Sequence, residues 1–151
     1  MASYLLVANE TAESQELLHA ISEILGQDPG AEFAIVVPAT PLNLLQQFEG
    51  TAQSARGLAA QRAQSIRQRL QSLGIRVQST RVGNWDPYVA IEDELLHNKY
   101  EAIVVSTLPR GLSRWLRMDL PSRVVRRHPG IRLVHVVARS SAGSSAVKSP
   151  K

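Results

Sequence analysis

Five short runs rich in apolar residues, spaced along the chain by longer segments, constrain the fold more than any other feature. They cover residues 4–8, 32–37, 75–82, 100–105 and 131–137. Four are continuously apolar for most of their length, which is typical of strands buried on both faces. The third run alternates apolar and polar residues, so we expect it at or near an edge of the sheet.

The segments between these runs have helical patterns. Residues 14–25 place apolar side chains at helical spacing, and Gly26 is expected to stop that helix. A second, amphipathic helix is predicted over 51–73 with Gly74 as its cap, and Asp86 and Pro87 are suited to begin a third. A further helical pattern runs from Leu112 to Arg127, broken near 119–121. This alternation predicts an α/β fold: an open, doubly wound sheet of five parallel strands with helices on both faces.

The composition fits one domain over 1–138, followed by a tail at 139–151 that is rich in Ser, Ala and Gly and expected to be disordered. The absence of cysteine excludes disulfides and thiolate metal sites, and the four histidines lack metal-ligand spacing. No secretory signal pattern is evident, and no apolar run approaches the roughly 20 residues that cross a bilayer. We therefore expect a cytoplasmic protein with no membrane segment.

Positive charge is concentrated in the second half of the chain. Residues 106–139 contain eight arginines and a single acidic residue, Asp119. Such a surface favours an anionic ligand, although an arginine-bearing helix face can simply be solvated. Nucleic acid is not expected as a partner, because Trp115 alone could stack a base among these charges.

In an open α/β sheet, ligands bind beyond the carboxyl ends of the strands. The candidate binding residues are therefore those that end or follow the first, second and fourth strands: Ala8, Asn9, Glu10, Thr11, Val37, Pro38, Ser106, Thr107, Arg110, Gly111, Ser113, Arg114, Asp119 and Ser122. Asn9, Glu10 and Thr11 are suited to hydrogen-bond a base or ribose, or only to cap the first helix. Arg110 and Arg114 are candidate phosphate partners, and Gly111 permits close backbone approach.

Three segments resemble the universal stress protein family. Residues 111–124, G-L-S-R-W-L-R-M-D-L-P-S-R-V, resemble that family's G-L-S-R-L-L-L-G-S-V-S-E-R-V. The opening V-A-N-E-T-A-E-S is similar to its V-A-V-D-G-S, and residues 83–91 are similar to its G-x-P-x-x-x-I. The resemblance covers roughly 4–138 and implies a Rossmann-like nucleotide-binding fold that dimerises through the last strand.

The chain departs from the motif with which ATP-binding members wrap phosphates, G-x2-G-x9-G followed by Ser or Thr. The first glycines are replaced within 106–109, the last pair is Met118-Asp119, and Asn9 stands where those members have Asp. We expect Leu108, Pro109 and Met118 to obstruct a triphosphate, and Asp119 to repel it. ATP, AMP, a cyclic nucleotide and another small anion remain open as ligands.

Three functions follow as hypotheses. The first is a universal stress protein-like regulatory domain that binds a nucleotide or other small anion and forms a homodimer. The second is an interaction module whose nucleotide site has decayed. The third is a weak nucleotide hydrolase, although the sequence offers no nucleophile with a base at recognisable spacing, so catalysis is not expected.

Overall fold

The computed structural model describes residues 2–40, 51–109 and 111–139, without the side chains of 51–54. The expected tail beyond Arg139 and the candidate Arg110 lie outside this part of the chain. The described elements are, in order, β1 (Ser3–Val7), α1 (Gln15–Gln27), β2 (Glu32–Pro38), α3 (Thr51–Ser72), β3 (Arg76–Gly83), α4 (Pro87–His97), β4 (Ala102–Thr107), α5 (Arg114–Arg117), α6 (Leu120–Arg127) and β5 (Arg132–Val137).

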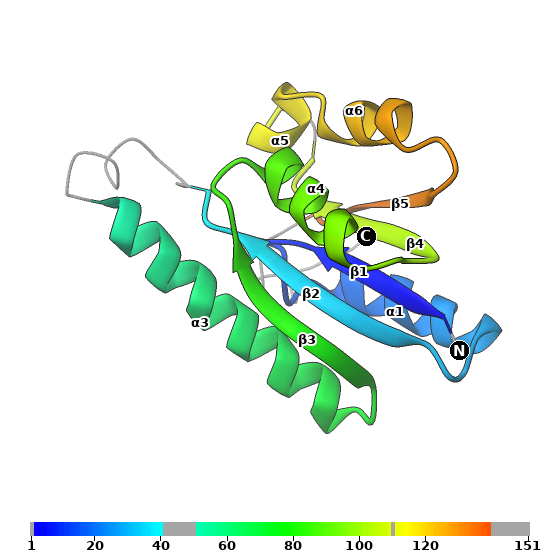
Figure 1. The fold of residues 1–151 in the computed structure, drawn as a ribbon. Coiled ribbons are helices and arrows are strands. Elements are labelled where there is room, and N and C mark those ends of the chain that lie inside the picture. The colour runs from blue at the N-terminus through cyan, green and yellow to red at the C-terminus, as the bar shows by residue number, and fades with distance from the viewer. Residues whose placement is uncertain (1, 41–50, 110, 140–151) are drawn as a thin grey trace.

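The five strands form one sheet in the order β3-β2-β1-β4-β5, and every neighbouring pair is parallel (Figure 1). This confirms the predicted doubly wound α/β fold. The third strand lies at an edge, as its alternating sequence predicted, and all of its residues are exposed or partly exposed.

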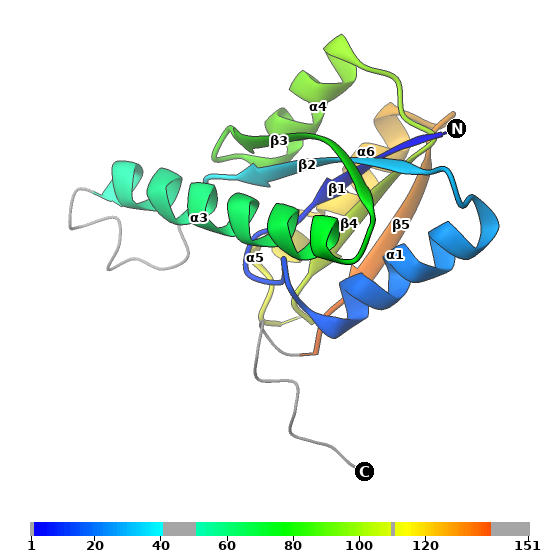
Figure 2. The ribbon, with the colours of Figure 1, turned by 90° about the horizontal axis from the view of Figure 1, so that it is seen from below.

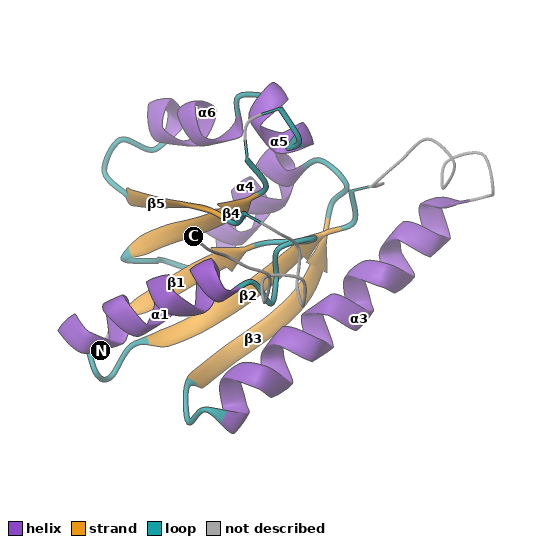
Figure 3. Cartoon of the chain, turned by 180° about the vertical axis from the view of Figure 1, so that it is seen from behind, coloured by secondary structure: helices purple, strands orange, loops and turns teal. Residues whose placement is uncertain are grey.

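Successive strand residues face opposite sides of the sheet, so each strand contributes to two apolar layers. Tyr4 and Leu6 of β1 belong to the layer that contains buried residues of α1 and α3. Leu5 and Val7 belong to the other layer, with buried residues of α4, α5 and α6. Figures 2 and 3 show the helices on both faces. The continuously apolar runs therefore reflect burial from both sides.

Helix capping agrees with the sequence at α4 and differs at α1. The Asp86 side chain accepts a hydrogen bond from the Tyr88 backbone N–H, and Pro87 opens α4 as expected. At α1 the cap is Ser14, whose hydroxyl accepts from Leu17 N–H at 3.1 Å. Capping by the residues at 9–11 is therefore wrong, and the side chains of Asn9 and Thr11 have other partners. Helix α1 also continues one residue past Gly26.

Three further expectations need correction. Ser106 and Thr107, expected in a loop, end β4, because they pair with Val136 and Val137 of β5. The helical pattern from Leu112 forms a helix only from Arg114, after the cap Ser113. Leu73, expected on the apolar stripe of the second helix, is 56% exposed because it lies past the end of α3.

Within the described ranges, no helix combines the length and apolar character that a bilayer crossing requires.

Candidate functional site

The carboxyl ends of β1 and β4 lie side by side, although the two strands are far apart in the sequence. The sheet order reverses between them, which is where open α/β sheets bind ligands. A pocket opens there, with about 350 Å³ of empty space when the part open to solvent is included. Its lining residues come from the ends of β1, β2 and β4 and from the segment at α5: Asn9, Glu10, Thr11, Thr40, Ser106, Thr107, Leu108, Ser113, Arg114 and Trp115.

Two hydroxyls link the loop after β1 to the end of β4 at the pocket. Thr11 Oγ1 and Ser106 Oγ are 2.6 Å apart, and both residues are almost completely buried. One hydroxyl donates its proton to the oxygen of the other, so the proton of the accepting hydroxyl is left for another acceptor. No described residue supplies one. The pair therefore presents a hydrogen-bond donor at the pocket wall.

Asn9 is held by two neighbours on the α3 side of the pocket. Its amide nitrogen donates to the Pro38 carbonyl at 2.8 Å, and its amide oxygen accepts from the Arg62 guanidinium of α3. Asn9 is 6% exposed, so these bonds fix the orientation of a buried side chain. Asn9 thus joins the ends of β1 and β2 to the helix that covers them.

The pocket contains charges of both signs. Glu10 is half-buried, and this burial raises the pKa of its carboxyl, while Arg62 and Arg114 act to lower it. Burial lowers the pKa of Arg62, and Glu10 opposes that shift. Among the described residues, Glu10 has neither a hydrogen-bond partner nor an ion pair within 4.0 Å. Its carboxylate is therefore available to a ligand.

The opposite wall combines an aromatic ring with hydrogen-bonded hydroxyls. Trp115 is 6% exposed and packs in the core, and its indole N–H donates to Thr40 Oγ1 at 3.4 Å. The Thr40 hydroxyl in turn donates to the Trp85 carbonyl at 2.7 Å. Thr107 Oγ1 lies 2.8 Å from His135 Nε2, which connects the pocket to β5.

The other candidates lie away from this pocket. Ala8 and Val37 are packed in the core, and Pro38 contributes its carbonyl to Asn9. Gly111 has φ +97°, a conformation that favours glycine, but no atom lies within 4 Å of where a Cβ would be. Asp119 is a left-handed cap of α6, 3.8 Å from Arg126, and Ser122 is an exposed residue of that helix.

The sequence did not indicate Arg62 or Thr40 as site residues. Arg62 lies on the polar side of an amphipathic helix, where nothing in the pattern distinguishes it from Arg56 or Arg67. Thr40 was part of the loop expected after the second strand, and only its contact with Trp115 places it at the pocket. Thr40 is a polar residue two positions after the end of β2, and this position was the one signal in the sequence that could have indicated it as a site residue.

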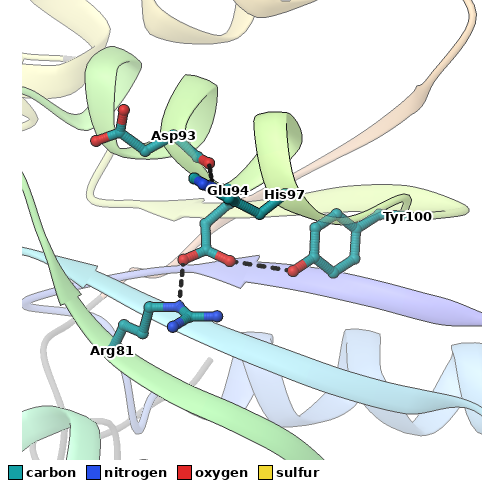
Figure 4. Close-up of polar contacts among 5 residues, drawn as sticks. All are labelled: Arg81, Asp93, Glu94, His97 and Tyr100. Atoms are coloured by element: carbon teal, nitrogen blue, oxygen red, sulfur yellow. Dashed lines mark hydrogen bonds and ion pairs between the residues drawn. The ribbon is translucent and has the colours of Figure 1, made fainter.

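A second polar cluster lies between β3 and α4 (Figure 4). Glu94 of α4 is 6% exposed, and its carboxylate accepts from Arg81 Nε at 2.7 Å and from the Tyr100 hydroxyl at 3.1 Å. Burial and the neighbouring Glu94 raise the pKa of Tyr100 to about 12. Each carboxylate oxygen of Glu94 has a hydrogen-bond donor. This cluster therefore has a structural role, because it holds the edge strand β3 against helix α4.

The fold and this pocket define an α/β domain with a polar cleft at its topological switch point. The described residues include no group of three or more His, Cys, Asp or Glu side chains placed to hold a metal ion. No protein-family model matches the sequence, and a search of curated proteins finds no match.

Proposed function

We propose that this chain is a universal stress protein-like regulatory domain that binds a nucleotide or other small anionic ligand between the ends of β1 and β4. The observation that carries the proposal is the Thr11–Ser106 contact of 2.6 Å. It brings the loop after β1 and the carboxyl end of β4 together at one pocket, where the family resemblance would put the ligand. Arg114 lines the same pocket, and Arg62 adjoins it through Asn9, which supports an anionic ligand.

Thermal unfolding with adenosine, AMP, cyclic AMP and ATP tests this proposal. A ligand present at 100 times its Kd stabilises the folded state by about 2.7 kcal/mol. We expect at least one member of the series to raise the Tm, and Ser106→Ala to reduce that rise. Ser65→Ala, an exposed change on α3, is the matched control and should leave it intact.

If the whole series leaves the Tm unchanged, binding of these nucleotides is excluded and the interaction module becomes the better hypothesis. Steady phosphate release from ATP that is lost in Ser106→Ala would instead favour the weak hydrolase. Neither alternative has a specific contact in its favour among the residues described.

We also propose that the chain forms a homodimer through β5, as the family resemblance implies. In the part of the chain that the structure describes, β5 pairs only with β4, so its other edge is open. An open strand edge presents backbone donors and acceptors to a second chain. Val137 of this strand is 42% exposed, which supplies apolar surface at that edge.

A further inference from the structure

Glu10 is an unusual group to find in an anion pocket. It lines the pocket beside the Thr11–Ser106 pair, is half-buried, and lacks a hydrogen-bond or ion-pair partner among the residues described. A carboxylate in such surroundings has lost part of its hydration without gaining a donor from the protein. A ligand that offers hydroxyl or amide donors would satisfy it, whereas a phosphate oxygen at the same position would repel it.

The charges around the pocket partly cancel. Arg62 and Arg114 are the two cations that act on Glu10. Each further phosphate on a ligand adds negative charge that the Glu10 carboxylate repels, so this repulsion is larger for a triphosphate than for a monophosphate. Asp119 takes no part in this balance, because its side chain is 61% exposed, is paired with Arg126, and lies outside the pocket lining.

We propose that Glu10 is the specificity-determining residue of this pocket. Its carboxylate admits ligands that carry at most one phosphate and that present hydrogen-bond donors to it, such as a sugar hydroxyl, and it excludes polyphosphates. This inference rests on the proposed function, since it concerns the same pocket. It assigns the rejection of a triphosphate to Glu10, where the sequence had assigned it to Leu108, Pro109, Met118 and Asp119.

Calorimetric titration of the full chain with adenosine, cyclic AMP, AMP and ATP at neutral pH tests the proposal. The base and sugar stay nearly constant through this series while the phosphate charge increases. We expect the wild-type protein to bind cyclic AMP and AMP on the order of tenfold more tightly than ATP. Glu10→Gln, which keeps the shape and removes the charge, should tighten ATP binding by about tenfold and change adenosine binding by less than about threefold.

Glu13→Gln is the matched control, because it makes the same change of charge three positions away and outside the pocket lining. It should leave the preference among the four ligands as in the wild type. Each titration is run with EDTA and again with Mg²⁺. Thermal unfolding of both variants without ligand verifies that they fold.

Three results would overturn the proposal: an unchanged AMP-to-ATP preference in Glu10→Gln, an equal effect of Glu13→Gln, or loss of Mg²⁺-ATP binding in Glu10→Gln. The last would make the carboxylate a metal ligand. If adenosine and AMP bind but the preference does not change, this inference alone fails. If none of the four binds to the wild type or to Glu10→Gln, the proposed nucleotide site fails with it.

Discussion

Arg81 and Arg126 each form an ion pair with a carboxylate, but the two carboxylates differ in exposure. The Glu94 side chain is 7% exposed, whereas the Asp119 side chain is 61% exposed. Removing the partner of a buried charge leaves that charge unsatisfied, while a surface pair contributes little. These two sites therefore separate the effect of burial from the effect of pairing.

We expect Arg81→Met to lower the free energy of unfolding by about 1–2 kcal/mol, below the full value for a buried pair because half of Arg81 is exposed. Arg126→Met should lower it by less than about 0.5 kcal/mol. Urea denaturation of both variants measures the difference. Equal losses in the free energy of unfolding would show that the buried Arg81–Glu94 pair stabilises the fold no more than the exposed pair does.

Glu10 should also make stability depend on pH. Burial raises the pKa of its carboxyl in the folded state, so the folded protein holds this proton more tightly than the unfolded chain. Its contribution is favourable below the unfolded pKa and is lost as the pH rises through the folded value. Glu10→Gln should therefore unfold at a higher Tm than the wild type at pH 7, with a smaller difference near pH 4. A Tm gain that is equal at both pH values would contradict this assignment.

Part of the site was predictable at this scale. Asn9, Glu10, Thr11 and Ser106 follow or end buried runs, and parallel strands bring such ends to one edge of the sheet. The roles of these residues were not predictable, because Ser14 rather than Asn9 or Thr11 caps α1. The capping hydroxyl is decided by where the helix begins, and several polar residues precede it.

At the scale of the elements, α4 packs closely on the sheet at one glycine. A Cβ at Gly83, the last residue of β3, would lie 2.8 Å from Ala90 Cβ and 2.8 Å from Val36 Cγ2. Both neighbouring residues are buried in the core, where side chains are closely packed. The glycine that begins the G-x-P-x-x-x-I-like segment is therefore a packing requirement.

We expect Gly83→Ala to destabilise the fold by about 1–3 kcal/mol, as overpacking does. Gly57→Ala makes the same chemical change within α3, where nothing lies within 4 Å, and should stabilise by about 0.5–1 kcal/mol. Thermal or urea unfolding of the two variants should give opposite signs. A stabilising Gly83→Ala would mean that α4 can move away from the sheet.

The strands were predictable because a strand that is buried on both faces has a continuous run of apolar residues, as at 33–37. Their ends were not, since pairing with a neighbour decides where a strand stops. Thr107 belongs to β4 because it pairs with Val137, a contact that the local sequence cannot indicate. The break at Asp119 was visible from Pro121, but the left-handed conformation there was not.

For the whole molecule, the open side of β5 gives the proposed dimer a test. Val137→Lys places a charge at that edge, and sedimentation should show a shift from dimer to monomer. Val125→Lys on α6, where the native side chain is 46% exposed, is the matched control and should leave the association unchanged. A monomeric wild type, or equal effects of both changes, would exclude pairing through β5.

The central position of β1 determines the order in which this molecule can form. Tyr4 pairs with Phe33 on one side and with Ala102 on the other. The second pairing of β1 can therefore form only after most of the chain has been synthesised. Contacts between such distant segments slow folding, because a large loop must close before they form. A nascent chain that ends before β4 would therefore expose one side of β1, and the pocket between β1 and β4 would be completed late in synthesis.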